Sequence, residues 1–242
     1  MVQDRTCSNR NYRQKASGVN MQLFSLVTLS ASAPLLINAA LTTLYIWFAA
    51  SCISIIVGTL TGLLRAHALR IPLASLLLDG ITLILRGIPL YAQLMIIYFI
   101  LPEVSLINLS SENASIIGLG LCSAAYVSET VRAGINALPT GQWDASFVLG
   151  YSPLQQLRFI VLPQAFRSIL PSLMNEYNMA LKSTAIVASI GTVELTKTGM
   201  NIIARSAEPL TITLAIAFIY LVLTGALSLI GQLLERKYYV NR

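Results

Sequence analysis

Long apolar stretches without a charged residue divide this chain. No Asp, Glu, Lys or Arg occurs in residues 16–64, 87–102, 113–128 or 209–234. A helix of about 20 apolar residues crosses the hydrocarbon core of a bilayer, so the first and last stretches are each long enough to span it. The two middle stretches are long enough when short polar flanks are added. The pattern therefore predicts an all-α, multi-pass membrane protein.

The lengths of these stretches predict five spans within a membrane domain over residues 36–237, with a long polar connection over residues 136–168. The spans are expected over about residues 37–64, 75–101, 114–135, 169–190 and 210–234. Residues 1–20 are polar and show no hydrophobic periodicity, which is typical of a disordered tail. Residues 21–35 are apolar but too short to span, so we expect them to lie at the membrane interface.

The polar connection between the third and fourth spans carries strong local signals. Pro139 stops the preceding helix, and Gly150 ends a short second one. Ser152, Pro153 and Gln155 then supply an N-cap, a proline at the first helical position and the glutamine of a capping box. The sequence therefore predicts two short helices joined by a tight turn, which form a folded surface.

Three polar residues of the second span are spaced by seven. Asp79, Arg86 and Gln93 fall close to one stripe of a helix, and that stripe cannot face lipid. A charge at the bilayer centre costs about 2.5–3.5 kcal/mol on insertion scales, so these side chains should face a protein interior or a wet cavity. Pro89 is expected to kink this helix. Two interpretations remain open, an Asp79–Arg86 pair that holds the bundle together and a pathway-lining role for Arg86.

Other spans carry residues at helical spacing. Gly58 and Gly62 allow close approach of a second helix, either in a specific dimer or in ordinary packing. Glu129 and Arg132 are spaced to pair along the third span.

Composition agrees with a membrane protein, because 55% of the residues are hydrophobic and 11% charged, against roughly 25% charged in an average soluble domain. The net charge of +6 comes from residues at the ends of apolar segments, which indicates topology rather than nucleic-acid binding. Cys7, Cys52 and Cys122 form no disulfide framework or metal motif. A single histidine, His67, and the lack of a phosphate loop exclude the common catalytic motifs, so any ATP must bind to another chain.

A pattern of residues at fixed spacing runs through the second half of the chain. It comprises Glu129, Arg132, Gly134, Leu138-Pro139, Gly141-Gln142, Asp144-Ala145, Gly150, Leu162-Pro163-Gln164, Arg167, Asn175 and Leu181-Lys182-Ser183-Thr184. This pattern resembles the membrane-spanning permease subunits of bacterial ATP-binding cassette (ABC) importers, in the branch that transports histidine, glutamine, arginine and glutamate. Arg86-Gly87-Ile88-Pro89-Leu90, with Gln93, is similar to that branch's second-helix signature. The resemblance covers about residues 35–237.

The resemblance implies a five-helix, type I (MetI-like) permease fold and a transport subunit that is not an enzyme. It implies ATP and Mg bound by a partner ATP-binding subunit, with no cofactor or metal in this chain. The other expected partners are membrane lipid, an extracytoplasmic amino-acid-binding protein and a second permease subunit, either the same chain or a homologue; no nucleic acid is expected.

The family's cytoplasmic loop docks a short helix onto the ATPase, which implies a coupling role for Gln142, Asp144, Ala145, Ser146 and Gly150. Asp144 and Ser146 depart from the family's usual Glu and Ala, but they keep a carboxylate and a small side chain. An amino acid needs fixed donors and acceptors where water is excluded. The candidates that could bind it are Arg86, Gln93, Tyr126, Glu129, Lys182, Ser183 and Thr184.

The expected location is the bacterial inner membrane, with the N-terminus outside and the C-terminus in the cytoplasm. Arg65, Arg70 and Arg236 then lie on the cytoplasmic side, in agreement with the positive-inside rule. The basic tail before Met21 would lie on the opposite side, against that rule. Two alternatives in function stay open, a permease for another small solute such as methionine and a stand-alone channel.

Overall fold

The protein is described from a computed structural model, in which residues 25–66, 72–105 and 107–238 are described. All regular elements in these ranges are helices, as the sequence predicts. They are α2 (Leu26–Arg65), α3 (Pro72–Gly87), α4 (Leu90–Met95), η2 (Ile96–Ile100), α5 (Leu101–Ser105), α6 (Ser111–Asn136), α7 (Thr140–Val148), α8 (Pro153–Gln156), η3 (Leu157–Val161), α9 (Leu162–Ser183), η4 (Thr184–Ile190), α10 (Leu195–Ser206) and α11 (Pro209–Tyr238). The tail predicted over residues 1–20 lies outside the described residues.

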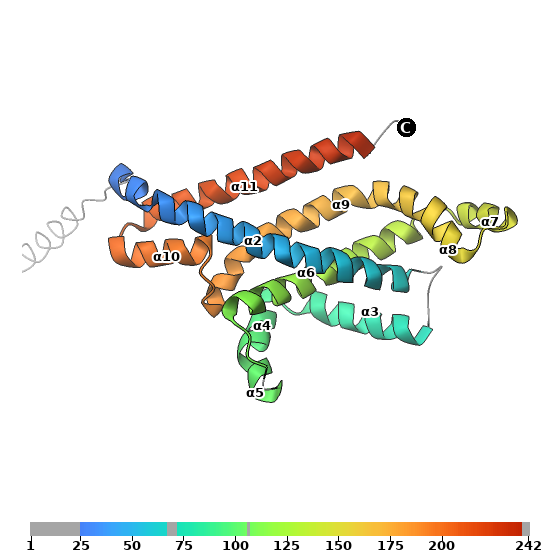
Figure 1. Cartoon of the computed structure of the whole chain (residues 1–242), viewed down its shortest axis with the longest axis horizontal. Coiled ribbons are helices and arrows are strands. Elements are labelled where there is room, and N and C mark those ends of the chain that lie inside the picture. Colours follow the sequence, from blue (N-terminus) through green and yellow to red (C-terminus); the bar gives the residue numbers. More distant parts are fainter. Residues whose placement is uncertain (1–24, 67–71, 106, 239–242) are drawn as a thin grey trace, which may run out of the picture.

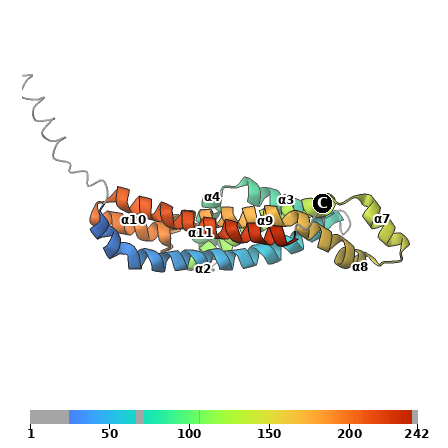
Figure 2. The same ribbon diagram turned by 90° about the horizontal axis from the view of Figure 1, so that it is seen from above.

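The four long helices α2, α6, α9 and α11 run along the length of the molecule (Figures 1 and 2). Helix α6 is central and contacts α2, α3, α4 and α9. The elements α7 and α8 lie at one end of the molecule, and α10 lies at the other (Figure 1). Helix α11 lies at the periphery, where it contacts α9, α10 and α2.

Helix α2 is longer than the first predicted span. It begins at the N-cap Ser25 and continues through Pro34 to Arg65, a length of 40 residues. The sequence divides these residues into an interfacial segment and a span, but the structure has one continuous helix. Proline removes one backbone donor, and an apolar sequence on both sides lets the helix continue past that single loss. At about 1.5 Å per residue, α2 is longer than a bilayer core is thick.

The second predicted span is broken rather than kinked. Helix α3 ends at Gly87, and the chain restarts at Leu90 in the α4–η2–α5 segment, bent by 103° from α3. This segment projects sideways from the bundle (Figure 1). Because the helix is broken, Asp79, Arg86 and Gln93 do not form the continuous stripe that a straight helix would give them.

Two glycines bring α2 against α6. An added Cβ at Gly58 would lie 2.8 Å from the Ala124 carbonyl oxygen, and one at Gly62 would lie 2.7 Å from the Ser128 carbonyl oxygen. These are contacts within one chain, so the structure accounts for the glycine spacing by internal packing rather than by a specific dimer.

By length and composition, three described helices could cross a bilayer, namely α2, α6 and α11, and the bent α3 and α4–α5 pair would add a fourth as one span. The fourth predicted span, over residues 169–190, corresponds to α9 and η4. Helix α9 carries Asn175, Glu176, Asn178 and Lys182 and therefore falls short of the apolar content of a span.

The polar connection folds as predicted. Helix α8 begins with a complete capping box between Ser152 and Gln155, and Gly150 adopts a φ of 79°. A positive φ is favourable for glycine and strained for other residues, so Gly150 lets the chain turn sharply between α7 and α8.

Candidate functional site

The break between α3 and α4 is stabilised by a side chain. Pro89 has no N–H group and leaves backbone carbonyls at the end of α3 without helical donors. The Gln93 Nε2 atom donates to the Leu85 carbonyl oxygen at 2.7 Å and to the Ile88 carbonyl oxygen at 2.8 Å. Gln93 is only 5% exposed. Its amide therefore holds the broken helix together, and the structure does not place it among the groups that face open space.

Arg86 lies beside this break and against Tyr126 of α6. Its guanidinium carbon is 5.4 Å from the centroid of the Tyr126 ring, a cation–π distance. The Tyr126 hydroxyl donates to the Arg86 carbonyl oxygen at 3.5 Å. The Arg86 side chain remains 40% exposed. Arg86 and Tyr126, both predicted as solute contacts, thus lie together.

Glu129 of α6 is shared by three arginines from three helices. Its Oε2 atom lies 3.0 Å from Arg65 Nη2, 3.2 Å from Arg132 Nε and 3.7 Å from Arg86 Nη1. Its Oε1 atom also accepts from Arg132 Nη2. The predicted pairing of Glu129 with Arg132 is confirmed, and Arg65 is a partner that the sequence analysis did not identify.

Arg65 also pairs with Asp79 of α3, with 2.6 Å between Arg65 Nε and Asp79 Oδ1. The Arg65 Nη1 atom donates to Ser128 Oγ at 2.9 Å. The open alternative of an Asp79–Arg86 pair is therefore not what holds the bundle: Asp79 pairs with α2, and Arg86 lies by Glu129. We call Arg65, Asp79, Arg86, Glu129 and Arg132 the arginine cluster.

The remaining predicted contacts lie where α9 passes into η4. Lys182 is exposed and Ser183 is half-buried. Thr184 is fully buried, donates to the Leu181 carbonyl oxygen at 2.7 Å and lies 3.3 Å from the Tyr220 hydroxyl. The element η4 contacts α4. Lys182 therefore has a free surface, whereas Thr184 serves internal packing.

Glu176 of α9 is an acidic group that the sequence analysis overlooked. It is half-buried and lies close enough to Arg86 for an electrostatic interaction. Glu176 follows Asn175 directly, and a charged residue within a predicted span was the signal that could have identified it. The region beside the break between α3 and α4 thus contains the positive charge of Arg86 and the negative charges of Glu129 and Glu176.

A second buried carboxylate begins α10. Glu194 is fully buried and accepts from the Thr196 and Lys197 backbone N–H groups at 2.9 and 2.8 Å and from the Tyr220 hydroxyl at 3.1 Å. Burial raises the pKa of Glu194 above its usual range. This N-cap fixes α10 against α11.

The connection over α7 and α8 presents apolar side chains to the outside. Phe147 and Val148 are 75% and 84% exposed, and Asp144 and Ala145 are exposed beside them. Ser146 is buried and donates to the Trp143 carbonyl oxygen at 2.8 Å. The Gln142 side-chain oxygen accepts from Gln164 Nε2 at 3.4 Å. An exposed apolar patch on a folded connection is typical of a surface that binds another protein.

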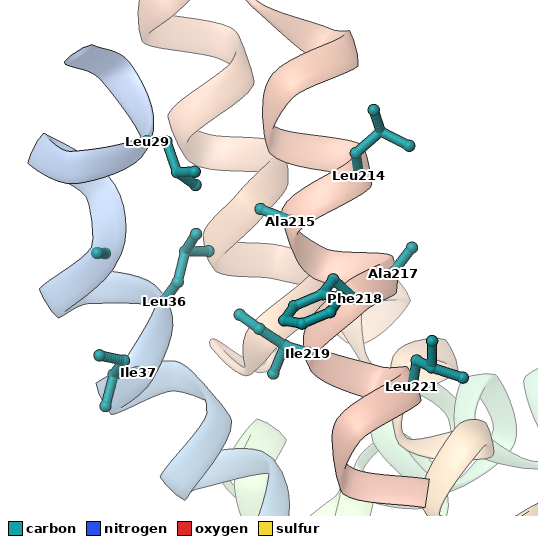
Figure 3. Close-up of a pocket in the computed structure, with 10 residues that line it drawn as sticks. Leu29, Leu36, Ile37, Leu214, Ala215, Ala217, Phe218, Ile219 and Leu221 are labelled. Carbon is teal, nitrogen blue, oxygen red and sulfur yellow. The ribbon is translucent and has the colours of Figure 1, made fainter. Parts of the chain in front are cut away.

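A cavity of about 610 Å³ lies between α2 and α11 (Figure 3). All ten of its lining residues are apolar, among them Leu36, Ile37 and Phe218. It offers no side-chain partner to a carboxylate or an ammonium group, so it does not suit a zwitterion. No group of His, Cys, Asp and Glu side chains in the described part of the chain could hold a metal ion.

The chain is similar in sequence to known transport proteins of the membrane. Residues 54–239 match the family described as binding-protein-dependent transport system inner membrane component. The chain is similar to the arginine transport system permease protein ArtQ of Bacillus subtilis (strain 168), with 35% identity over 208 residues that cover 86% of this chain and 94% of ArtQ. It is also similar to the glutamine transport system permease protein GlnP of Escherichia coli (strain K12), with 33% identity over 207 residues that cover 84% of this chain and 93% of GlnP.

Solved structures show the same fold. A crystal structure of an amino acid ABC transporter with histidines matches with a TM-score of 0.81 and 32% identity, and the match covers 88% of this chain and 98% of that one. The MetNI methionine ABC transporter matches with a TM-score of 0.75 at 19% identity over 88% of this chain and 99% of that one. The predicted MetI-like fold is confirmed.

Proposed function

Since the chain belongs to the family of binding-protein-dependent transport system inner membrane components, we propose that it is the permease subunit of an ABC importer for a polar amino acid. The chain is a membrane protein and a transport subunit rather than an enzyme. Its similarity to arginine and glutamine permeases along nearly their whole length supports an amino acid as the solute.

The observation that carries the solute class is the pairing of opposite charges beside the helix break. Arg86 is 40% exposed and lies only 3.7 Å from Glu129, with Glu176 nearby. An amino acid brings one carboxylate and one ammonium group, and a dry site must supply a partner for each. Arg86, Tyr126, Lys182 and Ser183 remain the candidate contacts. Glu129 is already paired with Arg65 and Arg132, so it contributes, like Gln93 and Thr184, through the structure around these contacts.

Coupling to ATP hydrolysis is assigned to α7 and the turn after it. In this proposal Gln142, Asp144, Ala145, Ser146 and Gly150 form the docking element for a separate ATP-binding subunit, which binds ATP and Mg. The exposed Phe147 and Val148 support a protein partner at this surface. A second permease subunit and an extracytoplasmic binding protein complete the importer.

The test is uptake by the importer reconstituted in vesicles with its ATPase and binding protein. A panel of labelled arginine, glutamine, glutamate, histidine and methionine identifies the solute, and we expect ATP-dependent uptake of a polar member. Uptake of methionine alone would contradict the polar class, and uptake without the ATPase would indicate a channel.

Variants in the coupling element test the second half of the proposal. Gly150→Glu and Ala145→Asp should assemble but lose ATP-driven uptake, because bulk and charge prevent the turn and the docking. Ser105→Glu in α5, away from α7, is the control and should transport normally. Normal solute-stimulated ATPase activity in both coupling variants would remove the basis for this assignment.

Orientation in the inner membrane is tested by cysteine labelling in a background without Cys7, Cys52 and Cys122. With the N-terminus outside and the C-terminus in the cytoplasm, a cysteine at Glu112 at the start of α6 should react with an impermeant thiol reagent in intact cells. A cysteine at Phe147 should react only after the membrane is opened. The reverse result would invert the proposed topology.

A further inference from the structure

We propose that Arg65 is a positioning residue for the solute site. Arg65 forms ion pairs with the Glu129 and Asp79 carboxylates. The Arg86 guanidinium therefore stays available to bind the carboxylate of the transported amino acid. This inference rests on the proposed function, and it adds a residue from α2, a helix that supplies none of the predicted solute contacts.

Arg65 connects the end of α2 to α3 and α6. It is the last residue of α2, and its side chain is only 6% exposed. Its three nitrogens engage Asp79 of α3 and Ser128 and Glu129 of α6, at distances of 2.6 to 3.0 Å. A planar fork with fixed donors suits such a task, and a lysine ammonium cannot reproduce it. Arg65 therefore sets where the two carboxylates lie.

The distances around Glu129 define a competition between arginines. Arg65 and Arg132 lie within hydrogen-bond distance of Oε2, at 3.0 and 3.2 Å, whereas Arg86 lies at 3.7 Å. Hydrogen bonds between N–H and oxygen have distances of roughly 2.7–3.2 Å. Glu129 is thus satisfied by the other two arginines, and Arg86 makes only a loose contact with it.

Arg86 consequently keeps much of its binding capacity. Its side chain lies against the Tyr126 ring, makes only the 3.7 Å contact with Glu129 and is 40% exposed. A guanidinium binds a carboxylate through two parallel hydrogen bonds, which requires that no internal carboxylate takes that position. If Arg65 is removed, Glu129 loses its nearest partner outside α6 and should draw Arg86 closer, in competition with the solute.

A purely architectural role for Arg65 makes a different prediction. In that case every further loss of charge from the arginine cluster should weaken solute binding further. If Glu129 and the solute carboxylate compete for Arg86, a second substitution, Glu129→Gln, should instead restore the solute affinity that the loss of Arg65 removed, because it releases Arg86. This rescue separates positioning from stability.

The experiment measures equilibrium binding of labelled L-glutamine and L-arginine to the purified permease–ATPase complex without the binding protein. The first variant is Arg65→Gln with Asp79→Asn, which removes a charge pair together and avoids a lone buried charge. We expect a Kd about tenfold weaker, the size of one lost charge-assisted hydrogen bond. Adding Glu129→Gln should return the Kd to the wild-type value. Arg205→Gln, which removes an exposed arginine of α10, is the control and should leave the Kd unchanged.

Amides of the same two amino acids, which lack the carboxylate, supply a second readout. The wild-type complex should prefer the acid over the amide, and the Arg65→Gln, Asp79→Asn variant should lose most of that preference. If the double variant does not assemble, Arg65→Lys keeps the charge without the fork and should weaken acid binding while it leaves amide binding unchanged.

Unchanged Kd values in the assembled variants, or failure of Glu129→Gln to restore binding, would overturn the inference while transport by the wild-type importer still stands. Absence of both transport and binding in the wild-type importer would instead contradict the proposed function.

Discussion

Helices α6 and α11 both qualify as membrane spans, but they lie in opposite environments. In the most apolar stretch of each, 56% of the residues are buried in α6 and only 6% in α11. The more apolar of the two is α11. In water the more apolar helix would be the more buried one, so the order is inverted here. In this chain, therefore, apolar character marks contact with lipid rather than the protein interior.

The packing of other helices against α6 depends on properties other than apolar character. Glycines of α2 allow its backbone to approach that of α6. Ser128 and Glu129 on α6 accept from Arg65. Lipid tails are as apolar as Leu side chains, so close packing and hydrogen bonds rather than hydrophobic burial drive helices together in a bilayer. α6 has these features, and α11 has an apolar surface.

The largest effect is expected from removal of Glu129, the half-buried acid of α6. Glu129→Leu leaves three arginines without their shared partner, which should cost about 3 kcal/mol, the lower end of the range for a broken buried pair because Glu129 is 26% exposed. The measurement is the melting temperature of the purified importer complex. Gln232→Leu, an exposed polar residue of α11, is the matched control and should be neutral. Equal losses in the two variants would break the contrast between the helices.

Introducing a charge on α11, rather than removing one from α6, tests whether the exposed face of α11 lies against lipid. Leu221→Arg places a charge near the middle of this helix on an exposed side, and it should cost about 2.5–3.5 kcal/mol of insertion. The fraction of chains that resist alkaline extraction from membranes reports this loss. Leu234→Arg, near the charged end of the same helix, can reach the interface and should insert normally. If Leu221→Arg inserts as well as the control, that face of α11 does not lie against lipid.

The same enlargement of a glycine should have opposite consequences in the two regions. Gly62→Leu forces a side chain against the backbone of α6 and should cost about 1–3 kcal/mol or more of stability. A Cβ added at Gly225 on α11 would meet nothing within 4 Å, and Gly225→Leu removes a poor helix former, so stability should hold or rise slightly. Thermal unfolding of the two variants compares them directly. A large loss for Gly225→Leu would show that a second protein surface covers α11.

The smallest effect is expected in the apolar cavity between α2 and α11. Phe218→Leu keeps an apolar surface toward lipid and should change stability by less than about 0.5 kcal/mol. The melting temperature should therefore match that of the wild type in lipid nanodiscs. A loss as large as that of Gly62→Leu would mean that Phe218 is packed against another subunit in the assembled importer.

Local signals in the sequence predicted local structure well. The capping box of Ser152 and Gln155 and the turn at Gly150 form as expected, because neighbouring residues alone determine them. Pro89 predicted a kink, and the helix instead breaks there. The angle of 103° and the role of Gln93 could not be predicted, because they depend on how α4 packs against α6 and η4.

Solvation and backbone chemistry act residue by residue, so the amino-acid sequence was enough to show that this chain is a helical membrane protein, which residues interrupt its helices and which charges must avoid lipid. The partners of these charges, by contrast, depend on how the helices pack. Arg65 had the pattern of a residue that marks the cytoplasmic end of a span, yet it lies buried between Asp79 and Glu129. Residues 14 and 64 positions apart along the chain become partners only when α3 and α6 pack beside the end of α2, and sequence spacing carries no record of that contact.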